Sequence, residues 1–135
     1  MTVLRRRRLP PELEARRRAL GELAPTLEAA KAALLDAVPG TRRPGRALAE
    51  ALLEFEDGLR TVRSGMDGWR APEVEDAWRA AAEGLETALA RAERLRAEAP
   101  EPAGFEGLIG VVGDLLEPLE AFPEAAERFR RLQTR

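Results

Sequence analysis

The chain has 135 residues, 44% of them hydrophobic and 34% charged, and its 22 basic and 24 acidic side chains leave a net charge of −2. This length and composition predict one domain with its own core rather than a disordered chain. Cysteine, histidine and tyrosine are absent, which excludes disulfides, thiolate or imidazole metal sites and catalysis by a histidine-activated nucleophile.

The first predicted helix covers residues 10–38 and follows a basic N-terminal arm, residues 1–9, for which disorder is an open alternative. Proline suits the first positions of a helix, and Pro10 and Pro11 stand there. The apolar side chains of this segment fall on one stripe, namely Leu13, Leu20, Leu23, Leu27, Ala30 and Leu34. Arg16 interrupts the stripe near the helix end, where its charged head can reach water. Pro25 removes a backbone hydrogen bond, which predicts a bend.

Two further helices are predicted over residues 45–66 and 72–99, each with an apolar repeat that alternates steps of three and four. The second segment and its turn carry Leu48, Leu52, Phe55, Leu59, Val62, Met66 and Trp69. The third segment carries Val74, Trp78, Ala81, Leu85, Ala88, Ala92, Leu95 and Ala99. No charge falls on either repeat, so we expect both stripes to face a dry core.

The fourth predicted helix, residues 104–133, continues the pattern with a proline near its middle. Its stripe is Phe105, Leu108, Val112, Leu115, Leu119, Phe122, Ala126 and Phe129. Pro118 predicts a bend or a break, and Pro123 could begin a separate final helix. Because the connections are short, neighbouring helices should be antiparallel. The sequence therefore predicts an all-α protein, with residues 10–135 forming one up-down-up-down four-helix bundle and helices 1 and 4 bent by proline.

The first half of the fourth helix is apolar around most of its circumference. Glycine recurs every third residue there, and further apolar side chains widen the face beyond the core stripe. The predicted interface residues are Gly107, Ile109, Gly110, Val111, Gly113 and Leu116. Each glycine costs a helix about 1 kcal/mol relative to alanine, which indicates a close approach of another backbone. That backbone belongs either to a second chain or to the same chain.

Two pairs of carboxylates stand at helical spacing, Glu54 with Asp57 and Glu73 with Asp76. They resemble the magnesium-binding motifs of the all-α nucleotide pyrophosphohydrolases, but the adjacent Glu-Glu pair of that family is missing. With Leu52 and Leu59 on the core stripe, Glu54 and Asp57 should point outward. We therefore expect solvated acidic faces here and no metal site.

The charges are divided along the chain. Residues 1–46 carry 11 bases and 5 acids, whereas residues 47–135 carry 11 bases and 19 acids. The candidate contacts to an anionic partner are Arg5, Arg6, Arg7, Arg8, Arg16, Arg17 and Arg18, at the end of the bundle that also holds Trp69 and Trp78. Because acids of the third helix dilute this field, we expect weak nucleic-acid binding. Pairing of the basic arm with an acidic surface is the competing interpretation.

These patterns predict a non-catalytic protein that acts through protein–protein contacts, as a scaffold or interaction module and as a homodimer. Two alternatives stay open: a binder of a small apolar ligand near the proline bends, and an accessory nucleic-acid binder. No cofactor and no membrane contact is predicted, because the apolar stripes lack polar groups and no segment is long enough to span a bilayer. Without a visible secretory signal we expect a cytoplasmic protein, and one lysine among 22 basic residues is typical of a GC-rich bacterial genome.

Overall fold

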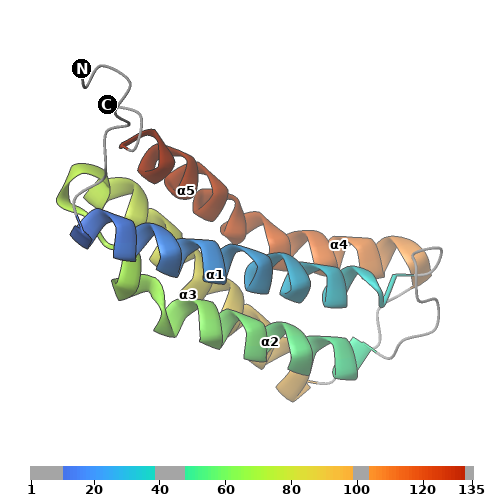
Figure 1. Cartoon of the computed structure of the whole chain (residues 1–135). Helices are drawn as coiled ribbons and strands as arrows, with labels where there is room; N and C mark the ends of the chain where they lie inside the picture. The colour runs from blue at the N-terminus through green and yellow to red at the C-terminus, as the bar shows by residue number, and fades with distance from the viewer. Residues whose placement is uncertain (1–10, 39–47, 99–103, 133–135) are drawn as a thin grey trace, which may run out of the picture.

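The computed structural model describes residues 11–38, 48–98 and 104–132, and most of these residues lie in α-helices or short 3-10 helices (Figure 1). The α-helices are α1 (Pro11–Leu35), α2 (Leu48–Ser64), α3 (Glu75–Glu98), α4 (Gly104–Leu116) and α5 (Ala121–Arg131). Short 3-10 turns separate some of them, namely η2 (Met66–Trp69), η3 (Pro72–Val74) and η4 (Glu117–Glu120). We call α4, η4 and α5 together the fourth arm. The predicted all-α, four-helix arrangement is confirmed, and none of the described residues forms a strand.

Glycines allow two helix pairs to approach closely. A side chain at Gly58 would place its Cβ 2.6 Å from the Cβ of Ala30, and one at Gly65 would lie 2.7 Å from Leu23. Residue numbers therefore rise along α2 as they fall along α1, and the two helices are antiparallel. On the other side of the bundle, a Cβ at Gly84 of α3 would collide with the carbonyl oxygen of Pro118. The pairs α1–α2 and α3–fourth arm are thus packed nearly backbone to backbone.

The two inner prolines have different effects. The α1 helix is a single α-helix from Pro11 to Leu35 with Pro25 inside it, so this proline does not divide the helix. Pro118 instead lies in η4, which separates α4 from α5. A proline cannot donate the backbone bond that an α-helix requires at its position, and the tighter 3-10 turn replaces that geometry. The single helix expected over residues 104–133 is therefore two α-helices, and the second begins at Ala121 rather than at Pro123.

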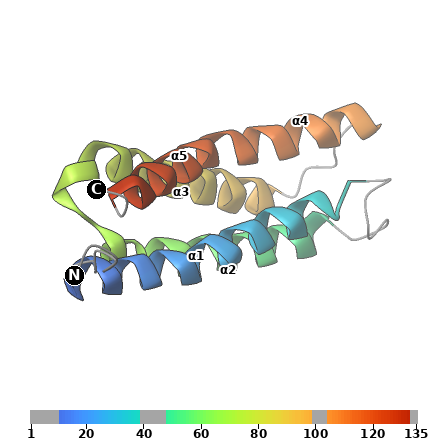
Figure 2. The same cartoon turned by 45° about the horizontal axis from the view of Figure 1, so that its top comes forward.

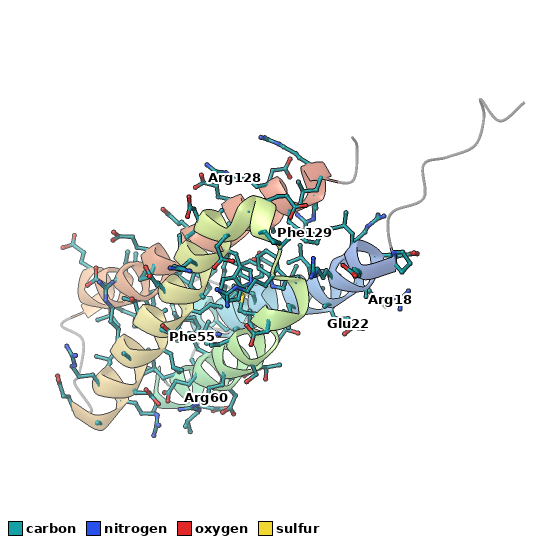
Figure 3. All side chains as sticks on the ribbon, turned by 90° about the vertical axis from the view of Figure 1, so that its left-hand side faces the viewer. Arg18, Glu22, Phe55, Arg60, Arg128 and Phe129 are labelled. Atoms are coloured by element: carbon teal, nitrogen blue, oxygen red, sulfur yellow. The ribbon has the colours of Figure 1, made fainter. Side chains whose placement is uncertain are left out.

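Most residues of the predicted apolar stripes are buried in the core, and a few are half-buried beside it. Ala99 and the side chain of Phe105, which the stripes also include, lie outside the described part. The largest fully buried side chains of the core include Leu27, Phe55, Leu59, Trp69, Leu85 and Phe129. The Trp69 ring meets Phe122 and Phe129 edge-on, with ring centroids 5.5 and 5.8 Å apart, an arrangement that aromatic quadrupoles favour. Figure 3 shows Phe55 and Phe129 inside the bundle and Arg18, Arg60 and Arg128 on its outside. None of the helices in the described part is both long and apolar enough to cross a membrane.

Candidate functional site

The α4 surface, defined as the six predicted interface residues, lies on the outer side of the fourth arm. Ile109 is 46% exposed, the highest value but one among large apolar side chains in the described part. Gly110 and Gly113 are exposed, and a Cβ at either would meet no described atom within 4 Å. Gly107, Val111 and Leu116 are half-buried. Close packing within the same chain therefore does not explain Gly110 and Gly113, although it does explain Gly58 and Gly84.

Acidic side chains surround the α4 surface. The sequence from Ala97 to Glu127 holds no base, and Glu106, Asp114 and Glu117 are exposed. Arg91 of α3 reaches α4, and its Nη1 donates to the carbonyl oxygen of Asp114 at 2.9 Å rather than to a carboxylate. Among the described residues these carboxylates have no ion pair, so the rim of the α4 surface carries uncompensated negative charge.

The predicted anionic-partner residues are only partly described. Arg5 to Arg8 lie outside the described residues. Arg17 and Arg18 are exposed at the start of α1 and Arg16 is half-buried, and within the described part none of the three forms an ion pair. The tryptophans at this end are 0% and 4% exposed, at Trp69 and Trp78 respectively. Neither ring is therefore open to stack on a base.

Two arginines, one in the turn before α3 and one in its first turns, pair with an acid at the start of α3. Arg70 donates through Nε to Glu75 at 2.9 Å and lies over the Trp78 ring, with its guanidinium carbon 4.2 Å from the ring centroid. Arg79 reaches the same carboxylate at 2.9 Å. Hydrogen bonds from these two guanidiniums, that of Arg70 first, lower the pKa of Glu75 from 4.5 to about 2. This cluster fixes the start of α3, and the Trp78 Nε1 donor strengthens it by a 2.8 Å bond to the carbonyl of Met66.

A buried carboxylate was not predicted. Glu56 of α2 is 0% exposed and accepts two bonds from Arg96 of α3, Nε to Oε2 at 2.7 Å and Nη2 to Oε1 at 3.0 Å. Arg60 adds a bond to Glu56 Oε1 at 3.3 Å and reaches Glu93 at 2.8 Å. These contacts raise the pKa of the Arg96 and Arg60 guanidiniums. The pairing of Arg96 with Glu56 joins α2 to α3 and satisfies a group that would otherwise be costly to bury.

The two carboxylate pairs point outward, as predicted from their positions. Glu54 and Asp57 are exposed and border a hollow of about 250 Å³ between α1 and α2. Glu73 and Asp76 are exposed in η3 and at the start of α3. The part of α3 that lies beside Glu54 and Asp57 of α2 is its other end, where Glu93 and Arg96 contact α2. The pairs are therefore not brought together. Within the described residues no group of three or more acids could hold a metal ion.

A groove of about 320 Å³ lies between α1 and α5, which we call the α1–α5 groove. Its apolar lining is Ala24, Leu27, Phe122, Pro123 and Ala126, and its polar lining is Glu28, Lys31 and Arg130. Lys31 pairs with Glu28 at 2.9 Å, whereas Arg130 has no ion pair in the part of the chain that the structure describes. The groove lies next to Pro25 in α1 and includes Pro123 of α5.

The groove exists because this edge of the bundle is the least tightly packed. The edges α1–α2 and α3–fourth arm are closed by glycines, and α2–α3 is joined by ion pairs. In Figure 2, α1 and the fourth arm lie in front of α2 and α3, with the α1–α5 edge toward the viewer.

Comparison of the chain with protein-family models, curated proteins and solved structures gave no significant match.

Proposed function

We propose that this chain is a non-catalytic interaction module that pairs with a second copy of itself through the α4 surface. The observation that carries the proposal is Ile109, nearly half exposed beside Gly110 and Gly113, at which no described atom approaches within 4 Å. Two exposed glycines cost α4 about 2 kcal/mol of helix stability relative to alanine. A second backbone packed closely against this face would require glycine at both positions, and this would explain why the less stable residue is present.

The other exposed large apolar side chains of the described part lie toward the same end of the bundle as the start of α4. Leu35 and Leu53, 42% and 47% exposed, lie at the end of α1 and the start of α2. Because the helices alternate in direction, these positions and the start of α4 share one end of the bundle (Figure 1). A standard protein interface buries roughly 800 Å² on each partner. The fourth arm has 28 residues and is about 40 Å long at 1.5 Å per residue. A contact along most of this length could bury an area of that size.

A second copy is favoured over an unrelated partner by charge. The rim of the α4 surface is acidic, and the same chain carries cations without ion pairs among the described residues, Arg17 and Arg18 on α1 and Arg130 on α5. In a dimer with a two-fold axis, an acidic group of each copy can pair with a basic group of the other, so the same ion pair forms at two symmetric places. No catalytic role is assigned, since the buried carboxylate is held by arginines and the exposed carboxylate pairs are apart.

The test is sedimentation equilibrium over a wide range of protein concentration. We expect a monomer–dimer equilibrium for the native chain and a weaker one for Gly110→Leu, because the larger side chain would hold the two backbones apart. The matched control is Gly21→Leu, at an exposed helical glycine on α1 that likewise has no described atom within 4 Å. A native chain that stays monomeric at the highest concentration would remove the proposal, as would equal effects of the two variants.

A further inference from the structure

The fourth arm carries a second stripe beside its core stripe. Ile109, Leu116, Pro123 and Arg130 are seven residues apart, and each directly follows a core-stripe position, of which Leu115, Phe122 and Phe129 are buried. Seven residues return a side chain to the same side of a helix. Because buried core residues precede the stripe positions on both sides of η4, the four residues stay on one side of the fourth arm across this turn. We call these four residues the flank stripe. Its first half belongs to the α4 surface and its second half to the wall of the α1–α5 groove.

We propose that the α1–α5 groove of one copy receives the α4 surface of the other, so that the two fourth arms lie antiparallel along their flank stripes. This inference rests on the proposed self-association and names the site that the α4 surface contacts. A two-fold axis across the flank stripe near η4 places the Ile109 end of each copy against the Arg130 end of its partner. Both contacts are then made twice, and the interface closes without further copies.

The groove and the α4 surface complement one another in shape. One water molecule occupies roughly 30 Å³ in the liquid, so a groove of 320 Å³ has room for about ten water-sized groups, which is the size of two apolar side chains. Leu27, Phe122 and Ala126 are already buried beneath it. A shallow groove of this kind suits side chains such as Ile109 and Leu116. The glycines beside them have no side chains, so the α4 backbone can approach the groove closely.

The charges are complementary as well. The polar lining of the groove contains two cations and one anion, Lys31, Arg130 and Glu28. In the antiparallel register, Glu106 lies one helical turn before Ile109 and faces Arg130 of the other copy. Neither Glu106 nor Arg130 has an ion pair among the described residues, so each gains a partner without losing one. A small apolar ligand would leave the uncompensated carboxylates of α4 unexplained, which is why we favour a second copy as the occupant.

The experiment is a charge exchange between copies. Arg130→Glu alone places two acids in contact at both symmetric sites, and Glu106→Arg alone places two bases there. We expect each variant to raise the dimer dissociation constant about ten-fold or more. Mixed in equal amounts, the two variants should form a heterodimer within about three-fold of the native affinity, because every contact again joins an acid to a base.

Control variants reverse charges on the exposed side of α3. Arg94→Glu and Glu83→Arg, both exposed, should leave the native affinity unchanged alone and mixed. A native dimer that tolerates Arg130→Glu and Glu106→Arg, or a mixture that stays as weak as its components, would overturn the inference and leave self-association intact. A native chain that never dimerises would overturn both. Binding of decanol to the native chain that Ala24→Leu abolishes, with dimerisation unaffected, would instead identify the groove as a small-ligand site.

Discussion

Replacing the buried Glu56 should reveal how strongly the α2–α3 edge depends on one carboxylate. Glu56 is fully buried, whereas the side chains of Arg96 and Arg60 are 39% and 44% exposed. Breaking a fully buried pair costs about 3–5 kcal/mol, because an uncompensated charge stays in the interior. In Glu56→Ala the two guanidiniums can turn toward water, so we expect a smaller loss than this range, about 2–3 kcal/mol, from the lost bonds and the cavity.

Removing the partner should cost more than removing the pair. Arg96→Met leaves the Glu56 carboxylate buried with only the longer bond from Arg60, and we expect a loss of about 3 kcal/mol or more. In the double variant Glu56→Leu with Arg96→Met no buried charge remains, so its loss should be smaller than that of Arg96→Met alone. Urea denaturation followed by circular dichroism at neutral pH measures all three free energies of unfolding.

The matched control is an exposed pair on the same two helices. Arg63 Nε lies 3.0 Å from Glu86 Oε1, and the two side chains are 36% and 56% exposed. Arg63→Met should therefore change the free energy of unfolding by no more than about 1 kcal/mol. Equal losses in Arg63→Met and Arg96→Met, or a double variant less stable than Arg96→Met, would refute the reasoning that burial of the Glu56 charge sets the cost.

Three further outcomes are expected. Gly84→Ala should destabilise the fold by about 1–3 kcal/mol because its Cβ meets the η4 backbone, while Gly21→Ala, with open space around it, should stabilise α1 by about 0.5–1 kcal/mol. Thermal or urea unfolding measures both changes, and two variants that both stabilise or both destabilise the fold would contradict the packing. Since the pKa of Glu75 is lowered to about 2 from 4.5, its contribution is complete above pH 4.5 and is lost as the pH falls toward 2; the stability gap between native and Glu75→Gln proteins should narrow over that range, and a constant gap would argue against it. A retardation assay near physiological salt should show weak, sequence-independent nucleic-acid binding that residues 1–8 supply, and quenching of Trp69 or Trp78 fluorescence by single-stranded nucleic acid would speak against it.

Helical periodicity was sufficient to predict the core. The stripes that contain Leu59, Leu85 and Phe129 are buried because spacing alone decides which side of a helix faces its neighbours. The same logic placed Glu54 and Asp57 outside. It missed Glu56, which stands beside the stripe and is buried where Arg96, 40 residues later, pairs with it from another helix. The available signal was the Glu56–Arg60 pair at helical spacing.

The candidate sites were only half predictable. Composition identified the glycines of α4, but whether another backbone already covered Gly110 depended on how far the fourth arm stands from its neighbours. The α1–α5 groove depends on the same distance, which no local pattern encodes. Conversely, Gly58 and Gly84 belong to no recognisable pattern in the sequence, although both allow close packing between helices. Spacing between helices, rather than the assignment of helices, is what the sequence left open.

The location of the α1–α5 edge also affects the expected order of folding. Both glycine-closed pairs join segments that follow one another along the chain, so their contacts close short loops and should form early. The α1–α5 edge alone joins the first helix to the last, and closing it carries the largest loop entropy for the fewest tight contacts. We expect this edge to form late and to contribute little to the folding barrier. Substitutions there should therefore change the proposed self-association while the folding rate stays nearly constant.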